Sequence, residues 1–346
     1  MTPKERVLCA LAFADTDIVP YQVDFTIPAR EKMSAYLSDP GFLEKLGNHL
    51  AYVKAIPPSG LQEVAPGFVQ DEWGVVWNRT IDPDIGNPIP VLSRPSLSGY
   101  RFPDPTDPLR YAHIPGFVER HQDTFKLLRE TYTLFERAWS LRGMEEFLSD
   151  MIMHQDFVED LLDAITSFHL EVIDRALDLG LDGVLFGDDW GWQGGLIMGP
   201  KLWRKYIKPR MAEMIALVRK KGKKTFLHCC GKVQEIFPDL VEIGLHVFNP
   251  FQPEVMDVFA LKEKYQGKLA FWGGISIQRL LPFGTPEEVR RETCQILARL
   301  GDGGGYIAAP SHALPRDIPC ENIAALLEVL MNQKGNGRFL RQSPRE

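Results

Sequence analysis

His228 and Cys230 are the residues of this chain whose types and spacing best suit chemistry. They end a short, β-prone apolar run at 225–227, they flank Cys229, and Gly231 follows them. In a strand, residues i and i+2 share a face, so His228 and Cys230 point the same way and Cys229 points the opposite way. Imidazole and thiolate at this spacing favour Zn²⁺. The alternative is a core histidine beside two buried cysteines. Their place in the chain favours the metal pair.

That place is the end of one of several regularly spaced strands. We predict strands at 183–186, 225–227, 246–248, 269–272 and 306–309, with helices at 200–221, 233–243, 255–265 and 286–300 between them. Such alternation indicates parallel strands joined by crossovers. Polar or special residues follow each strand: Asp188, Asp189 and Trp190, then His228 and Cys230, then Asn249 and Gln252, then Gly273 and Gly274, and lastly Ser311 and His312. In a barrel these ends meet on the C-terminal face, where barrel enzymes keep their sites.

The first half of the chain supplies the remaining expected strands. We expect them at 17–25 after an opening amphipathic helix, at 61–64, and at 132–135 before a long helical zone at 143–179. Residues 68–79 alternate like a hairpin, and the Pro-rich stretch 83–108 is expected to be a loop. The tally reaches eight strands. We therefore predict an α/β protein, a single (β/α)8 TIM barrel domain over 1–346 with an N-terminal helix and a hairpin and Pro-rich loop insertion.

Composition excludes several classes of protein. The 346 residues are 45% hydrophobic and 25% charged, which suits a globular chain with a large core. A net charge of -7 argues against nucleic-acid binding. The five cysteines include one adjacent pair and have no regular spacing, so they do not indicate a disulfide framework. The N-terminus lacks an apolar signal segment, and no apolar run is long enough to span a bilayer. We expect a cytoplasmic protein.

Several segments resemble the uroporphyrinogen decarboxylase superfamily, especially its corrinoid-dependent methyltransferase-like branch. They are residues 4–8 with 17–20, the hairpin residues 71–74, residues 134–139 and 187–189, the His228-x-Cys230-Gly231 run, and residues 272–275, 310–312 and 321–323. The resemblance spans nearly the whole chain. It implies a single (β/α)8 barrel.

The superfamily performs two unrelated reactions. True uroporphyrinogen decarboxylases use no metal and hold an octacarboxylate substrate with an arginine-rich segment after the first strand. The equivalent stretch here, residues 21–30, contains one arginine, Arg30, and Asp24 would repel carboxylates. The zinc methyltransferases of the other branch have His-x-Cys after one strand, matched by His228 and Cys230, and a Cys after the last strand. Here Ser311 and His312 stand at that last position.

The resemblance therefore implies Zn²⁺ held by His228, Cys230 and His312. Exchanging a thiolate for a neutral imidazole makes the centre a stronger Lewis acid, which suits an oxygen or nitrogen leaving group. We expect demethylation of a small methylated substrate, a methyl ether or methylamine, with the corrinoid (cobalamin) cofactor supplied by a partner protein. Barrels of this kind often pair, so a homodimer is also expected, with no nucleic-acid or membrane partner.

Other candidate residues keep two interpretations each. Asp188 and Asp189 could each act as a general base, as a hydrogen-bond partner for His228 or as a metal ligand. The structural alternative is that they cap a turn after the strand. Glu72 on the hairpin suits a catalytic carboxylate at the mouth of the barrel or a surface carboxylate. The expected substrate-binding residues, which plain packing also explains, are Trp73, Trp190, Asn249, Gln252, Gly273, Gly274 and Ser311. A metal-independent decarboxylase or other lyase, and a degenerate non-catalytic barrel, remain as alternative functions.

Overall fold

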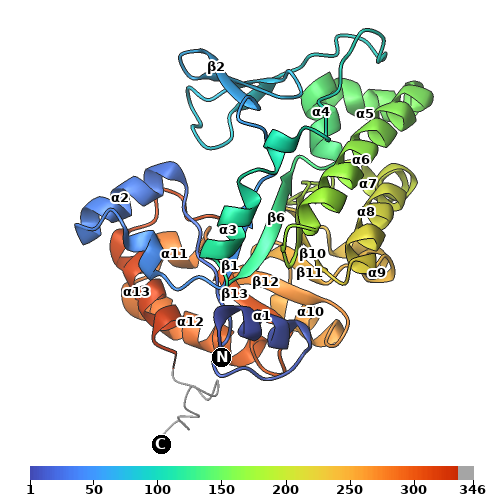
Figure 1. Ribbon diagram of the computed structural model, residues 1–346. Coiled ribbons are helices and arrows are strands. Elements are labelled where there is room, and N and C mark those ends of the chain that lie inside the picture. Colours follow the sequence, from blue (N-terminus) through green and yellow to red (C-terminus); the bar gives the residue numbers. More distant parts are fainter. Residues whose placement is uncertain (334–346) are drawn as a thin grey trace, which may run out of the picture. The chain divides into compact units, whose positions relative to one another are not determined.

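The computed structural model describes residues 1–333, whose elements are labelled in Figure 1. Two compact units make up the chain. The first contains residues 1–51, 122–125 and the chain from 246 onward, and the second contains residues 52–121 and 126–245. That residues 1–346 act as a single domain stays a prediction.

The main sheet confirms the α/β class. Its seven strands follow the order β1 (Leu50–Val53), β6 (Phe125–Thr131), β7 (Gly183–Gly187), β10 (Lys224–His228), β11 (Val247–Phe251), β12 (Ala270–Ile275) and β13 (Tyr306–Pro310). The pairs β6–β7, β7–β10, β11–β12 and β12–β13 are parallel. The last five of these strands lie where the sequence predicts them, with ends that differ by at most three residues.

The expected strand at 17–25 is not a strand, so the main sheet of the described residues has seven strands and is not a closed ring of eight. Tyr21 makes an isolated parallel bridge with Ala308. Pro20 has no backbone N–H to donate to a ladder. The N–H of Val23 donates instead to the side chain of Asn48 at 2.9 Å. The N–H of Gln22 still donates to the carbonyl of Ala308 at 2.9 Å, so this segment keeps a few backbone hydrogen bonds to β13 (Tyr306–Pro310) without forming a continuous strand.

The early insertion is a second, antiparallel sheet. Its strands are β2 (Leu61–Ala65), β3 (Phe68–Asp71), β4 (Val76–Asn78) and β5 (Asn87–Ile89). The hairpin predicted at 68–79 is confirmed, and β5 lies inside the stretch predicted to be a loop. The strand predicted at 61–64 exists as β2, but all its residues are exposed, so it does not belong to the main sheet. The main sheet has β1 instead, which the sequence did not reveal.

The strand expected at 132–135 is also wrong, because the real strand, β6, comes just before it. Charged residues interrupt the apolar pattern of β6 in the sequence. In the fold two of them have a partner: Lys126 lies 3.1 Å from a carboxylate oxygen of Asp182, and Glu130 lies 2.7 Å from Nδ1 of His169. Paired charges can be buried, so this strand tolerates residues that a sequence pattern counts against it.

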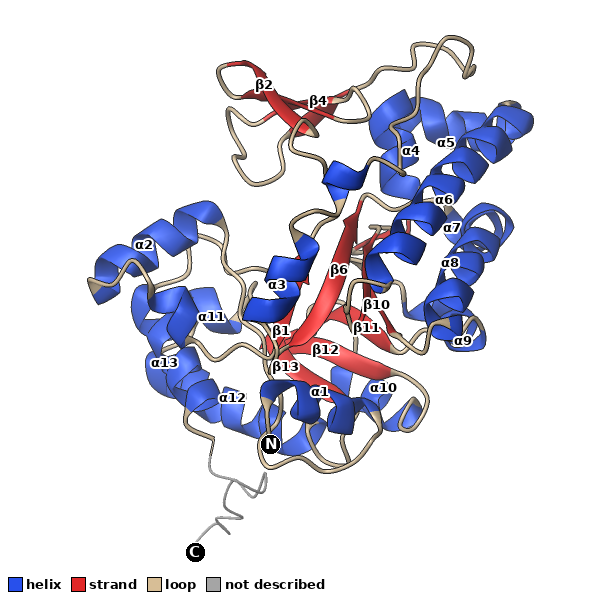
Figure 2. Ribbon diagram, in the orientation of Figure 1, coloured by secondary structure: helices blue, strands red, loops and turns tan. Residues whose placement is uncertain are grey.

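Helices of the second unit gather on one side in Figure 2, where α4 (Phe135–Arg142), α5 (Met144–Met153), α6 (Gln155–Leu177) and α8 (Lys208–Lys220) pack together. The predicted zone 143–179 thus breaks at His154. The remaining short elements are η2 (Pro108–Arg110), α3 (Ile114–Arg120), β8 (Gly191–Trp192), β9 (Gly195–Leu196), α7 (Gly199–Leu202), the π-helix η3 (Trp203–Ile207), η4 (Gln234–Ile236) and α9 (Phe237–Glu242).

The first unit holds the other helices, α1 (Pro3–Leu11), α2 (Ile27–Leu37), η1 (Phe42–Lys45), α10 (Val258–Lys264), α11 (Leu280–Phe283), α12 (Pro286–Leu300) and α13 (Cys320–Met331). The predicted start of α12 is confirmed: the Thr285 side chain accepts from the N–H of Glu288 at 3.2 Å, and the Glu288 side chain accepts from the N–H of Thr285. No helix within residues 1–333 is long and apolar enough to cross a membrane.

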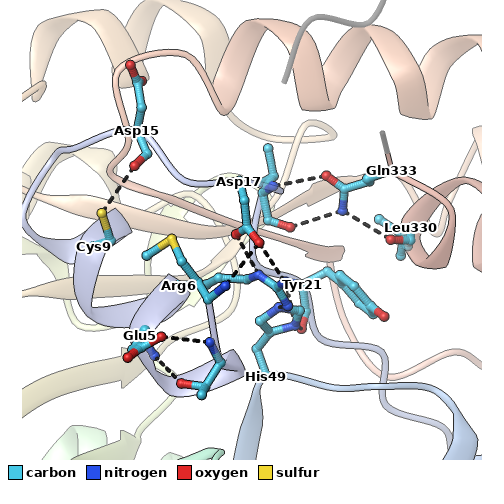
Figure 3. A network of polar contacts seen from close by, with 12 residues as sticks. Glu5, Arg6, Cys9, Asp15, Asp17, Tyr21, His49, Leu330 and Gln333 are labelled. Atoms are coloured by element: carbon cyan, nitrogen blue, oxygen red, sulfur yellow. Dashed lines mark hydrogen bonds and ion pairs between the residues drawn. The ribbon is translucent and has the colours of Figure 1, made fainter. Parts of the chain in front are cut away.

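A polar network fastens α1 to the residues that follow it, as Figure 3 shows. Arg6 donates through Nε and Nη2 to both carboxylate oxygens of Asp17, each at 2.7 Å. The buried His49 lies beside them, with Nε2 3.5 Å from Nη1 of Arg6 and Nδ1 3.4 Å from the N–H of Tyr21. This cluster supports the unit and keeps a histidine away from water.

Candidate metal centre

His228 and Cys230 lie together at the end of β10. Nε2 of His228 is 3.5 Å from Sγ of Cys230, and both side chains are half-buried. Cys229 points the other way and is fully buried, and its sulfur accepts the N–H of Trp190 at 3.3 Å. Two ligands of one tetrahedral zinc ion, with Zn–N near 2.0 Å and Zn–S near 2.3 Å, would lie about 3.6 Å apart. The pair therefore fits a shared ion.

Two glycines allow the backbone beside this pair to pack tightly. A Cβ atom on Gly231, where φ is +90°, would come within 2.4 Å of the carbonyl carbon of Gly191. The adjacent N–H of Lys232 donates to the carbonyl of Trp192 at 2.9 Å. Only glycine fits such an approach at a positive φ, so Gly231 holds the segment after Cys230 against the segment after Asp189.

Asp189 contacts the pair through its side chain, whereas Asp188 contacts it through its backbone N–H, which donates to the carbonyl of His228 at 3.0 Å. Oδ1 of Asp189 accepts the backbone N–H of Cys230 at 2.7 Å. Asp188 is fully buried and accepts the N–H groups of Phe135 and Glu136 at 3.0 and 2.8 Å, as well as the indole N–H of Trp190. Burial raises the pKa of Asp188 to about 6 even though these donors oppose the shift. Asp188 thus joins the start of α4 to the end of β7.

Glu136 is a candidate that the sequence analysis quoted only as part of a resemblance. It lies in the first turn of α4, and burial, followed by the nearby carboxylates of Asp189 and Asp188, raises its pKa well above the usual range. Burial, Asp189 and Glu136 also raise the pKa of the Cys230 thiol. A carboxyl group that keeps its proton therefore lies close to a thiol that must lose its own to bind a metal.

The candidates of the other compact unit lie within β11 and β12 or just after β11 and β13. Ser311 is fully buried, with Oγ 3.5 Å from a carboxylate oxygen of Glu254, and His312 beside it is half-buried. Asn249 is buried and donates to the carbonyl of Trp272 at 3.0 Å, and Gln252 is also buried. Substrate contacts by these residues stay predictions.

Packing already accounts for two of the predicted substrate-binding glycines. A Cβ atom on Gly273, where φ is +136°, would meet the backbone nitrogen of Phe251 at 2.5 Å, which would push β11 away from β12. A Cβ atom on Gly274 would meet the hydroxyl of Tyr306 at 2.8 Å. The strand contacts require glycine here whether or not a ligand binds.

The two candidates on the hairpin, Glu72 and Trp73, each contact an arginine. Glu72 accepts from Nη1 of the buried Arg110 at 3.0 Å and also from its Nη2. Trp73 is buried, with its ring centroid 4.7 Å from that of Phe168 and the guanidinium of Arg137 4.9 Å from its ring. Both residues thus have structural partners. Because the ion pair occupies the carboxylate of Glu72, the catalytic role expected for Glu72 has no support in these contacts.

Comparison with known families agrees with the sequence resemblance. The family model described as uroporphyrinogen decarboxylase (URO-D) matches residues 132–332, more than half of the chain. The chain belongs to the uroporphyrinogen decarboxylase family. The match covers the ends of β7, β10, β11, β12 and β13, where the candidate residues lie.

Relatives within this family carry two different activities. The chain is 25% identical over 190 residues to the methylcobamide:CoM methyltransferase MtaA of Methanosarcina barkeri, covering 55% of this chain and 53% of MtaA. It thus spans about half the length of that relative. It is also 25% identical over 269 residues to a uroporphyrinogen decarboxylase of Coxiella burnetii (strain Dugway 5J108-111), covering 73% and 70% of the two chains. A solved methyltransferase from Methanosarcina mazei shares the fold, with a TM-score of 0.71, 19% identity, and coverage of 96% and 98%.

Proposed function

We propose that this protein is a zinc-dependent methyltransferase. It moves a methyl group between a small methylated substrate, a methyl ether or methylamine, and the corrinoid cofactor of a partner protein. The observation that carries the proposal is the 3.5 Å separation of Nε2 of His228 and Sγ of Cys230, which suits two ligands of one zinc ion. The name of the relative MtaA, a methylcobamide:CoM methyltransferase, supports the reaction class.

His312 is the third ligand in this proposal. Within residues 1–333, His228, Cys230 and His312 are the group of His, Cys, Asp and Glu side chains suited to hold a metal ion. Two imidazoles and one thiolate leave a zinc ion with one position open, as catalytic sites require. They also leave it one positive charge, whereas a site with two thiolates is neutral. That charge favours a substrate whose oxygen or nitrogen must be polarised.

The surrounding side chains have distinct tasks. Zinc, when bound, polarises the heteroatom that carries the methyl group. Asp189 holds the Cys230 segment through its backbone N–H. Glu136 holds a proton at its half-buried carboxyl, which suits it to protonate the departing oxygen or nitrogen. Asp188 keeps Glu136 in place through the N–H groups at the start of α4.

The family also includes decarboxylases, so that activity needs its own test. Arg30 is the one arginine in residues 21–30, where the decarboxylases have an arginine-rich segment, and this argues against an octacarboxylate substrate. Adding uroporphyrinogen to the purified protein with a chelator separates the two functions. Decarboxylation under these conditions would assign the protein to the metal-independent reaction.

Metal analysis combined with methyl transfer tests the proposal itself. The wild type and Cys294→Ser, which changes a half-buried thiol on α12, are expected to hold one zinc per chain. Cys230→Ser is expected to lose zinc and the demethylation of a panel of methyl ethers and methylamines by free cob(I)alamin. Full activity of a zinc-free wild type would refute the proposal.

A further inference from the structure

In the second compact unit, three arginines lie near enough to a lysine to affect its pKa. The lysine is Lys54, which follows β1, and the arginines are Arg79, which follows β4, Arg129 in β6, and Arg137 in α4. The ammonium of Lys54 is accessible to solvent, yet its pKa falls to about 8. Desolvation by surrounding atoms is the largest cause, and the guanidinium groups of Arg129, Arg79 and Arg137 add to it against the opposing effect of Glu130.

Three of these cations lack an anionic partner among the residues that the structure describes. Arg137 pairs with Asp71 at 2.7 Å. Within residues 1–333, no carboxylate forms an ion pair with Lys54, Arg79 or Arg129. Nε of Arg79 is buried and has no hydrogen-bond partner in this part of the chain. Clustered positive charges without a counter-charge repel one another. The arrangement therefore favours the binding of an anionic ligand at these side chains.

Strand register places Arg129 on the same face of the sheet as His228. Thr131 and His228 are both level with Gly187 in the parallel pairs β6–β7 and β7–β10, so their side chains point to one face. Arg129 is two residues before Thr131 and shares that face. Glu130 points to the opposite face, where it meets His169 of α6. Arg129 and His228 lie two strands apart across the sheet and two residues apart along it. Their Cα atoms are therefore separated by about 12 Å.

We propose that Lys54, Arg79 and Arg129 bind the oxyanion group of a ligand, a carboxylate or a phosphate, whose other end reaches His228 and Cys230. The inference rests on the proposed function and adds a substrate class to it: a small methylated compound that also carries an anionic group. Guanidinium groups suit this task because their planar N–H pairs match the two oxygens of a carboxylate or phosphate. The guanidinium of Arg129 also lies 5.7 Å from the ring centroid of Tyr52, which limits its motion.

Calorimetric titration with matched probes tests this inference. The probes are 4-methoxybenzoate, its neutral analogue 4-methoxybenzamide, and inorganic phosphate. The benzoate is expected to bind the wild type at least about 10-fold more tightly than the amide, since hydrogen bonds to charged groups are the stronger ones. Arg129→Gln should raise the Kd for the benzoate at least about 10-fold. Lys201→Gln, which removes an exposed cation on α7, should change it less than about twofold.

Arg79→Gln is a second variant, because Arg129 lies within a strand and its replacement can disturb folding. Phosphate binding more tightly than the benzoate would support the site with a phosphate as its natural ligand. Equal binding of the amide and the benzoate, or an unchanged Kd in both arginine variants, would overturn the inference. Zinc content distinguishes a failure of this inference from a failure of the proposed function. If the protein holds zinc but does not bind the anion, the inference fails and the proposed function stands. If it binds the anion but holds no zinc, the proposed function fails and the anion site stands.

Discussion

Zinc affinity should depend steeply on pH, and Cys230 should be the cause. Burial, with the carboxylates of Asp189 and Glu136, raises the pKa of this thiol, so the metal-free protein keeps the thiol protonated near neutral pH. Only the thiolate binds zinc, so each ion that binds must displace one proton. The apparent affinity should therefore rise about tenfold for each pH unit, or about 100-fold from pH 7 to pH 9, which corresponds to about 2.7 kcal/mol.

A competition titration against a chromophoric chelator at stepped pH values measures this slope. Calorimetry in two buffers of different ionisation enthalpy counts the released protons independently. Cys230→Ser should bind zinc more weakly and lose the slope, because the substitution removes the thiol that must give up its proton. Cys294→Ser should keep both the slope and the affinity of the wild type. Zinc binding by the wild type without proton release would show that the thiolate of Cys230 is not a ligand.

Two further predictions concern stability. Burial, and after it the charge of Arg6, lowers the pKa of His49 to about 4. The unfolded chain therefore binds more protons between pH 6.5 and pH 4, and the unfolding free energy should fall by about 3 kcal/mol as pH decreases through that window. Urea denaturation at stepped pH measures the fall, and His49→Asn should flatten it. Glu72→Ala leaves the buried Arg110 without its carboxylate and should lower the unfolding free energy by about 3 kcal/mol with zinc content unchanged. Lost methyl transfer at unchanged stability would instead assign Glu72 to the chemistry.

Sequence patterns located the late strands well and the early ones poorly. The strands at 183–187, 224–228 and 306–310 are almost wholly buried and uncharged apart from their ends, so their sequences show plain apolar runs. β6 contains Lys126, Arg129 and Glu130, and two of these charges are paired with residues at least 39 positions away. Such pairing is invisible to a local pattern.

The candidate site was likewise only partly predictable. Strand periodicity was enough to place His228 and Cys230 on one face, because alternation is a local property of the backbone. Glu136 stands in an ordinary helical segment, and only the packing of α4 against the ends of β7 and β10 gives its carboxyl a role. Lys54, Arg79 and Arg129 come from three separate elements, so no spacing in the sequence relates them.

By itself the sequence determined the α/β class, the positions of the last five strands and the shared face of a histidine and a cysteine. Each of these follows from interactions between residues near one another in the chain. Tertiary structure alone decided that residues 17–25 do not form a strand, that Glu72 pairs with Arg110, and that the carboxyl of Glu136 lies near those of other acids. The physical reason is that residues distant in the chain determine whether a side chain is buried and which group pairs with its charge. These contacts in turn determine the protonation state of the side chain and the hydrogen bonds of the backbone.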